Sequence, residues 1–182
     1  MIIQEATQVG SPIIRKKSKA IVLSRIKTKE IKKIVQDLID SMHHHQLVGM
    51  AAPQIGKNLR IFVTEIRETQ LRKADSDKEI DNLRVFINPQ IISRSKKSTS
   101  RYEGCGSVAY AQIFATVSRP ESVRVRAFDE KGERFVLGAS GLLARVIQHE
   151  LDHIDGKVFL DREFDSKSLM SKHEYIAKFK KK

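Results

Sequence analysis

The stretch IQHELDHIDG, residues 147–156, constrains this chain more than any other, because it places two histidines four residues apart. On a helix, His149 and His153 would lie on one face about one turn apart, so both imidazoles could reach one metal ion. Glu150 is offset by one position and could take a proton from an attacking water without binding the ion. The pattern therefore predicts a helix that carries part of a hydrolytic metal centre.

A motif this short also arises by chance on charged amphipathic helices, where it has no function. Here, apolar Leu142 and Val146 lie seven and three residues before His149, so an apolar stripe continues into the histidine face. Histidines that are partly buried need partners, and a shared metal ion supplies one. We therefore favour a metal site over a chance match.

The third ligand decides the class of enzyme, because catalytic metal sites usually have three protein ligands and one open position. One candidate is Glu174, 21 residues after His153, at a spacing that some metallopeptidases use. However, its lysine-rich surroundings are typical of a surface helix. The other candidate is Cys105, which lies between Gly104 and Gly106 in YEGCGSV. A thiolate binds borderline divalent metals strongly, and glycine neighbours allow close backbone approach, so we favour Cys105.

Composition and charge indicate a globular protein with a basic surface. Its 182 residues fit one domain, and 40% apolar residues are enough for a core. No apolar run approaches the roughly 18 residues that a membrane span needs. The first residues lack the pattern of a secretion signal, and a single cysteine excludes an internal disulfide, so we expect a cytoplasmic protein. The net charge of +12 favours contact with polyanions such as ribosomal RNA.

Hydrophobic spacing predicts two helices. From Thr28 to His45, apolar residues recur at spacings of three and four, which indicates an amphipathic helix. A second helix is expected over residues 141–154, with Ser140 as its N-cap and Gly156 just beyond its end. The run His43 to His45 closes the first helix, and we assign these histidines to solvent.

Runs rich in β-branched and aromatic residues predict strands at 59–66 and 83–93. Residues 122–139 alternate around a Lys-Gly turn, which is typical of a hairpin. The polar stretch 67–82 is expected to be an exposed loop. Strands that are separate from two helices predict an α+β fold, with largely antiparallel sheets around a central metal-binding HExxH helix.

Three stretches, LVGMAAPQ (47–54), EGCGS (103–107) and QHELDH (148–153), resemble in order and spacing the three motifs of peptide deformylases. Those motifs run approximately G-φ-G-φ-A-A-x-Q, E-G-C-φ-S and Q-H-E-x-D-H, where φ is apolar. The likeness covers most of residues 5–162. It implies a deformylase-like catalytic domain over residues 1–165, followed by a basic C-terminal tail or helix over residues 166–182.

The resemblance implies a metal-dependent hydrolase that removes the N-formyl group from N-formylmethionyl nascent peptides and releases formate. Carried over residue by residue, it implies Cys105, His149 and His153 as metal ligands and Glu150 as the general acid and base. The implied metal is Fe²⁺, with Zn²⁺ or Ni²⁺ as alternatives.

The resemblance also implies how the substrate is held. Gln54 would donate its side-chain amide, and Gly106 its backbone N–H, to the formyl oxygen, where charge develops during attack. Backbone groups around Gly49 and an apolar pocket for the methionine side chain would complete the site. The residues expected to form that pocket are Val48, Leu142 and Val146, for which core packing is an equal alternative.

Three further residues are expected to support the metal ligands. Glu103 and Asp152 would hold ligands in orientation through hydrogen bonds. Arg145 lies one turn before His149 and is expected either to pair with Glu103 or to lie on the surface.

The chain departs from the family pattern at substrate-positioning places. Leu47 replaces the first glycine of the first motif, where a positive φ would now carry a steric cost. Gly106 replaces the apolar residue after the cysteine, and Val108 leads into AYAQIF where the family often has Val-Pro-Gly. No departure falls on a proposed ligand or on Glu150, so we expect metal binding and hydrolytic chemistry to persist. The departures leave the rate and the substrate range open.

The resulting expectation is a monomer, without a membrane segment, that acts on nascent chains close to the ribosome through its basic surface. Removing residues 178–182 is expected to weaken ribosome association. Two alternatives stay open: a deformylase-like hydrolase with an altered formyl or acyl amide substrate, and a catalytically weak ribosome-binding paralogue. The sequence supports RNA binding poorly as a main role, because no basic stretch is interleaved with stacking aromatic residues.

Overall fold

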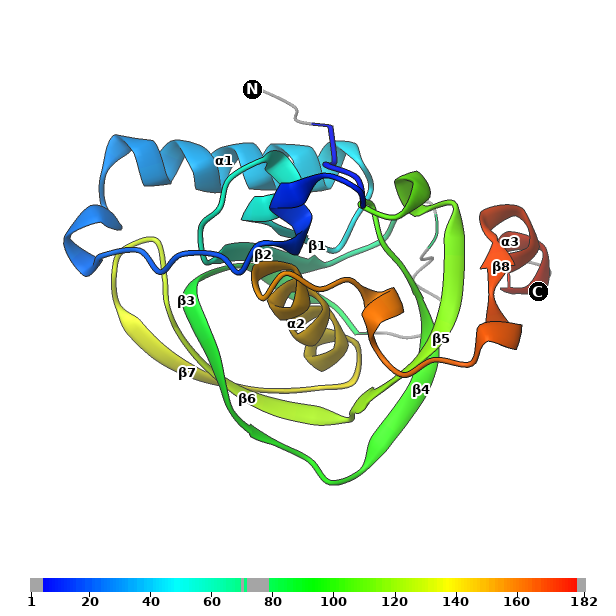
Figure 1. The fold of residues 1–182 in the computed structure, drawn as a ribbon. Coiled ribbons are helices and arrows are strands. Elements are labelled where there is room, and N and C mark those ends of the chain that lie inside the picture. The colour runs from blue at the N-terminus through cyan, green and yellow to red at the C-terminus, as the bar shows by residue number, and fades with distance from the viewer. Residues whose placement is uncertain (1–4, 70, 72–78, 180–182) are drawn as a thin grey trace.

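The computed structural model describes residues 5–69, 71 and 79–179, and its helices and strands are shown in Figure 1. The α-helices are α1 (Lys29–His44), α2 (Gly141–Ile154) and α3 (Lys172–Phe179). The strands are β1 (Gly49–Ala51), β2 (Ile61–Ile66), β3 (Asp81–Arg94), β4 (Ser98–Gly104), β5 (Ile113–Pro120), β6 (Ser122–Phe128), β7 (Arg134–Ser140) and β8 (Met170–Ser171). Short 3₁₀ helices occupy Pro12–Arg15, Leu23–Arg25, Ala52–Ile55, Ala109–Ala111, Phe159–Asp161 and Ser166–Ser168.

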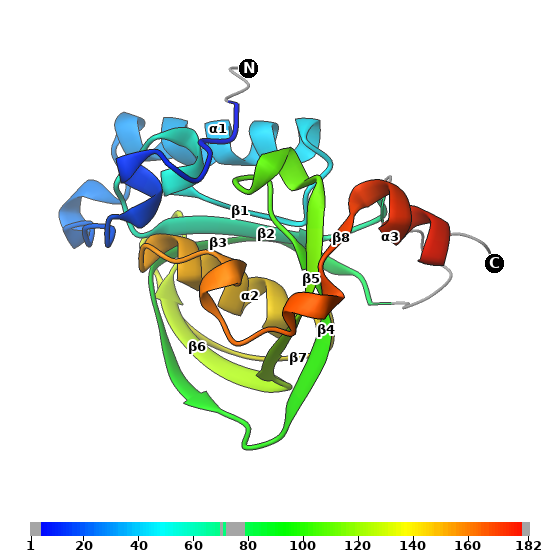
Figure 2. The same ribbon diagram turned by 45° about the vertical axis from the view of Figure 1, so that its right-hand side comes forward.

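The strands form two sheets, one with the order β1-β2-β3-β6-β7 and one with the order β4-β5-β8. Every pair of neighbouring strands in these sheets is antiparallel. Helix α2 lies at the centre with strands on several sides, whereas α1 covers the outer side of β1 and β2 (Figures 1 and 2). The predicted α+β class, with antiparallel sheets around the histidine-bearing helix, is confirmed.

Helix α1 forms where its sequence period predicts it. Thr28 caps it, because its Oγ1 accepts a hydrogen bond from the backbone N–H of Ile31 at 3.4 Å. Leu38 and Met42 of the apolar stripe are fully buried against the core that includes β1 and β2, and Ile39 is partly buried there. Of the three histidines assigned to solvent, His43 and His44 are exposed, as expected, whereas His45 is half-buried.

Helix α2 has the predicted bounds but a different N-terminal cap. Ser140 is at the N-cap position, yet its side chain accepts no capping hydrogen bond. Instead, the backbone N–H of Leu142 donates to Glu79 Oε2 at 2.6 Å, so a residue from the chain before β3 satisfies the first turn. Ala144 and Ile147 pack into the core with Phe62 and Phe86, whose rings stack at 4.6 Å. Packing on all sides also buries the polar residues of α2, which must then find partners inside the protein.

One further prediction differs in detail from the structure, and another is confirmed. Strand β3 begins at Asp81, so the last two residues of the loop predicted over 67–82 are strand; residues 70 and 72–78 of that loop lie outside the described part of the chain. The predicted hairpin is confirmed as β6 and β7, with Gly132 at φ 77° in the turn.

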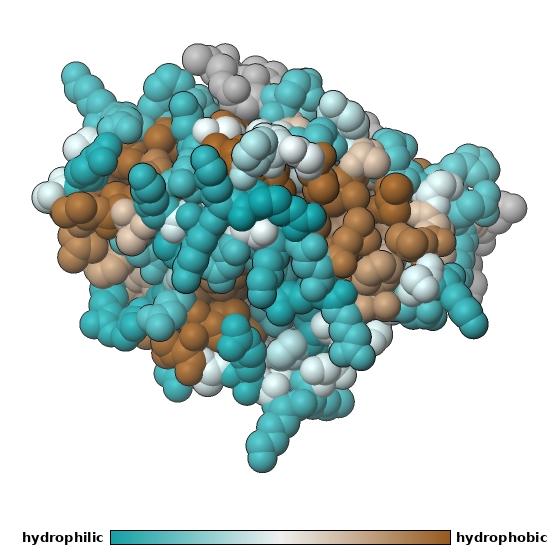
Figure 3. Space-filling view, viewed as in Figure 1, coloured by the Kyte–Doolittle hydropathy of each residue, from teal (hydrophilic) through white to brown (hydrophobic). Residues whose placement is uncertain are grey.

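The face seen in Figure 3 is mostly polar, with apolar side chains gathered beside β5 and α3. The exposed apolar residues of these two elements include Ile113 and Phe179. Among the described residues, no helix combines the length and the apolar character that crossing a bilayer requires.

Candidate metal centre

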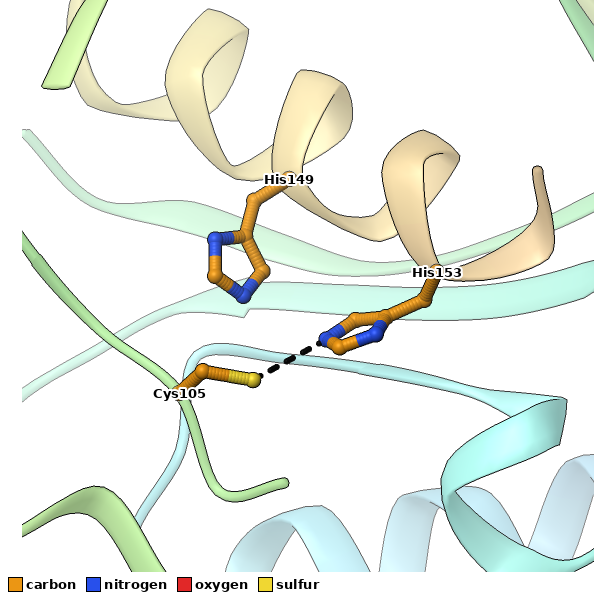
Figure 4. Close-up of side chains that lie close together, drawn as sticks. All are labelled: Cys105, His149 and His153. Atoms are coloured by element: carbon orange, nitrogen blue, oxygen red, sulfur yellow. Dashed lines mark hydrogen bonds between the residues drawn. The ribbon is translucent and has the colours of Figure 1, made fainter. Parts of the chain in front are cut away.

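Cys105, His149 and His153 converge at the centre of the molecule. One ligand atom from each lies within 4.8 Å of the others, and Cys105 Sγ lies 3.1 Å from His153 Nε2. Figure 4 shows both imidazoles projecting from α2 toward Cys105, which directly follows β4. Cys105 and His153 are almost completely buried. Within the described residues this is the one cluster of three such side chains.

The donor set fits a divalent metal of borderline softness. Burial raises the pKa of the Cys105 thiol, but the charge and hydrogen bonds of His153 and His149 outweigh it and lower this pKa to about 5. The backbone N–H of Ser107 also donates to the sulfur at 3.4 Å. These contacts favour the thiolate form of Cys105, and one thiolate with two imidazoles is a donor set that suits zinc or iron.

The glycines beside Cys105 have packing roles that the sequence argument did not anticipate. A Cβ on Gly104 would lie 2.6 Å from the Phe114 ring, so this glycine lets β4 pack against β5. A Cβ on Gly106 would lie 3.2 Å from Leu47 Cδ1. Both glycines therefore make room for a neighbouring side chain.

Glu103 orients His149. Its Oε2 lies 3.0 Å from His149 Nδ1, which leaves Nε2 of that ring for a metal. Arg119 donates two hydrogen bonds to Glu103, at 2.6 and 2.8 Å, and Arg145 donates a third at 2.5 Å. Burial alone would raise the pKa of Glu103, but its hydrogen bonds with Arg119 and His149 hold that pKa well below its usual value. Of the two alternatives for Arg145, pairing with Glu103 is the one observed.

Arg119 also reaches the second acidic residue expected to support the ligands. It donates to Asp152 Oδ2 at 2.8 Å, and Arg162 donates to the same carboxylate. One buried guanidinium therefore ties β4, through Glu103, to α2, through Asp152. Arg119 was not among the residues expected at the site. It lies on β5 two residues after buried Val117, so an alternating strand pattern over 113–120 would have placed it on the inner face.

Glu150 is buried beside the Cys105, His149 and His153 cluster, and one of its two carboxylate oxygens has no fixed partner. It is 3% exposed, and Oε2 makes no hydrogen bond. Burial raises the pKa of this carboxyl to about 7. A Cβ on Gly49 would lie 2.6 Å from Glu150 Oε1, so the missing side chain of Gly49 leaves space for Glu150. An acid with a pKa near neutrality can both accept and return a proton.

Gln54 is held so that its amide nitrogen is directed at the cysteine loop. Its Oε1 accepts a hydrogen bond from the backbone N–H of Ala51 at 2.8 Å, and its Nε2 donates to Ser107 Oγ at 3.3 Å. The anchored oxygen fixes which end of the amide is available as a donor.

A pocket of about 180 Å³ joins these groups. Its walls contain the four residues expected to bind substrate, namely Val48, Gly49, Leu142 and Val146, together with Gln54, Cys105, Gly106, His149 and Glu150. The structure adds Leu47 and Tyr102, which were not expected in the pocket.

Glu174 does not belong to the cluster of Cys105, His149 and His153. Its side chain is 67% exposed on α3, beside His173, so the alternative with Glu174 as third ligand is wrong.

The family model for polypeptide deformylase matches residues 3–169 of the chain. The chain belongs to the peptide deformylase family. Peptide deformylases are metal-dependent hydrolases of protein biosynthesis, and the Cys105, His149 and His153 donors fit that requirement.

Known deformylases resemble the chain along most of its length. The peptide deformylase of Dictyoglomus thermophilum is 39% identical over 161 residues, which are 88% of this chain and 93% of that protein. The peptide deformylase of Treponema pallidum is 44% identical over 115 residues, and this match spans 63% of the chain and 62% of the relative. A Met-Ala-Ser-bound crystal structure of the Acinetobacter baumannii class I type b enzyme superposes with a TM-score of 0.81 at 25% identity. It covers 89% of this chain and 100% of that one.

Proposed function

We propose that this protein removes the N-formyl group from N-formylmethionyl nascent peptides and releases formate. The main support for the proposal is that one pocket contains Glu150, Gln54 and two of the three clustered residues, Cys105 and His149. Hydrolysis of an amide needs a proton carrier and donors for a developing oxyanion, and this pocket offers both.

Cys105, His149 and His153 would hold one divalent ion, for which we propose Fe²⁺, with Zn²⁺ or Ni²⁺ as substitutes. When bound, the ion supplies Lewis-acid assistance to hydrolysis. The contact between Glu103 and His149 Nδ1 holds the His149 ring so that its Nε2 faces Cys105.

Glu150 is the proposed proton carrier. Its carboxylate takes a proton from the attacking water and returns it to the amine of the leaving peptide, so the protein ends the cycle in its starting state. The pKa of about 7 that burial gives this carboxyl suits both steps near neutral pH.

Gln54 and Gly106 are the proposed donors to the formyl oxygen. The amide oxygen of Gln54 is occupied by the Ala51 N–H, which leaves Nε2 as the group that faces the pocket. Donors that are already fixed before the reaction stabilise the negative charge on that oxygen without reorganisation.

Val48, Leu142 and Val146 are the proposed apolar walls for the methionine side chain, and Gly49 is the proposed backbone partner of the peptide. Support comes from their shared position on the wall of the pocket that contains Glu150. The Acinetobacter baumannii relative binds Met-Ala-Ser, the peptide that remains when formyl-Met-Ala-Ser loses its formyl group.

We also propose that the protein is a cytoplasmic monomer that works close to the ribosome. The net charge of +12 supports the ribosomal part of this proposal, because a basic surface attracts RNA. The division into a catalytic domain over 1–165 and a basic C-terminal segment over 166–182 is part of the same proposal, and residues 180–182 lie outside the described part of the chain.

The decisive experiment measures formate release from formyl-Met-Ala-Ser by protein purified anaerobically with Fe²⁺ or loaded with Ni²⁺. Glu150→Ala should bind metal and lose turnover, whereas Glu130→Gln, at an exposed position, serves as the matched control. Turnover that persists in Glu150→Ala would contradict the role of Glu150. Wild-type protein with full metal content and no turnover would contradict the substrate, and a panel of other formyl and acyl amides would test the alternative of an altered substrate.

A further inference from the structure

Leu47 and Gly106 are neighbours on the wall of the pocket. Both residues line it, and a Cβ on Gly106 would lie 3.2 Å from Leu47 Cδ1. That separation is tighter than ordinary van der Waals contact, so a side chain at 106 would compete with Leu47 for one space. Two of the three departures from the family pattern, Leu47 and Gly106, are therefore neighbours although 59 positions separate them in the sequence. One adds a side chain where the pattern has glycine, and the other removes one.

The turn after α1 holds Leu47 firmly. Its backbone N–H donates to Met42 O at 3.0 Å, and its carbonyl accepts a hydrogen bond from Arg67 at 3.0 Å. The positive φ of this turn, 56°, falls on Gln46, so Leu47 does not carry the steric cost expected from the sequence. Leu47 also packs against the core under α1. Its side chain can therefore act as a fixed wall.

The space that Leu47 fills adjoins the two proposed donors to the formyl oxygen. The same hypothetical Cβ on Gly106 would lie 3.9 Å from Gln54 Nε2. An apolar group at this point keeps water away from the donors, and hydrogen bonds to a developing charge are stronger where water is excluded.

We propose that Leu47 is a positioning residue that covers the Gln54 and Gly106 donors. Leu47 belongs to the first family motif, and its side chain takes the place of the apolar side chain that the second motif lacks at Gly106. The inference rests on the proposed deformylase function and deepens it. Positions 47 and 106 then form one functional unit. An apolar side chain at either position can cover the donors, but there is no space for one at both positions.

A double-mutant cycle tests this unit with four proteins: wild type, Leu47→Gly, Gly106→Leu and the double variant. Each is assayed for metal content, thermal unfolding, and kcat and KM for formate release from formyl-Met-Ala-Ser. Leu47→Gly should keep its metal and lose about tenfold to a hundredfold in kcat, with a smaller change in KM, because the cover acts on charge that develops during the reaction. Gly106→Leu should lose both thermal stability and kcat/KM.

If the two substitutions acted independently, their fold losses in kcat/KM would multiply in the double variant. The kcat/KM of the double variant should be at least about tenfold higher than that product predicts, because the leucine at 106 then has space. Leu47→Met, which keeps an apolar side chain, should recover most of the kcat that Leu47→Gly loses. Losses that simply multiply in the double variant, or a Leu47→Met as slow as Leu47→Gly, would overturn the inference and leave the deformylase function standing. Metal-loaded wild type without formate release would overturn both.

Discussion

Glu103 lies 3.0 Å from Nδ1 of His149, and this contact connects the metal centre to a chain of buried charges. The carboxylate fixes the ring orientation, while Arg119 and Arg145 hold the carboxylate. The His149 imidazole is therefore positioned by residues of β4, β5 and α2 together.

Glu103→Gln should weaken metal binding about 10- to 100-fold, because a neutral amide orients His149 less firmly. The measurement is competition for Ni²⁺ between the protein and a chelator, with circular dichroism to verify folding. Glu121→Gln is a suitable control, since Glu121 pairs with Lys97 at the surface. Equal affinities in the two variants would contradict the orienting role of Glu103.

Arg119→Met should destabilise the protein by about 3–5 kcal/mol, because it leaves the buried carboxylates of Glu103 and Asp152 without their shared partner. Urea unfolding of metal-free protein measures the effect. Arg94→Met removes the same charge at an exposed position and should change stability by no more than about 0.5 kcal/mol. Similar midpoints for both variants would show that the buried network contributes little.

The low pKa of Glu103 predicts that acid lowers the free energy of unfolding. Because this pKa is lower in the folded protein than in the unfolded chain, the stability contributed by Glu103 is complete above the unfolded value of about 4. It is lost as pH falls through the folded value. Unfolding free energy of metal-free protein should therefore decrease below about pH 5, and more steeply in wild type than in Arg119→Met. Parallel slopes would argue against the network as the cause.

Ala111→Gly should stabilise the protein by roughly 0.5–1 kcal/mol, because Ala109, Tyr110 and Ala111 all have left-handed backbones, with φ of 47°, 52° and 57°. Only glycine adopts this conformation without steric cost. Ala177→Gly makes the same change inside α3, where it should destabilise the helix by about 1 kcal/mol. Thermal unfolding distinguishes the two signs, and destabilisation by Ala111→Gly would show that the turn is not strained.

Changing the three terminal lysines, 180–182, to glutamine should weaken ribosome association at low salt, with the difference vanishing as salt rises. This design is sharper than removal of residues 178–182. Removal would also take Phe179, whose ring lies 5.5 Å from that of Tyr102 on the pocket wall. Turnover of a short formyl peptide is the control and should not change. Ribosome co-sedimentation that is equal with and without the lysines would exclude this contact.

The sequence determined the parts of the site that depend on one element. Apolar spacing, with Ser140 before it and Gly156 after it, predicted the bounds of α2. Helical geometry alone places His149 and His153 on one face, because side chains four residues apart lie one above the other, and it places Glu150 beside them. Cys105 was also predicted from a local pattern, a thiol between two glycines, and the resemblance to the family motifs then implied the same residue.

Tertiary packing decided the rest, since it joins residues that no local pattern relates. Cys105 meets His153 across 48 residues, and Leu47 meets Gly106 across 59. The cap of α2 comes from Glu79 instead of Ser140, because the chain before β3 brings a carboxylate to the open first turn. Arg119 is part of the site only because β5 turns it inward between two acidic residues, where burial makes each charge depend on the others.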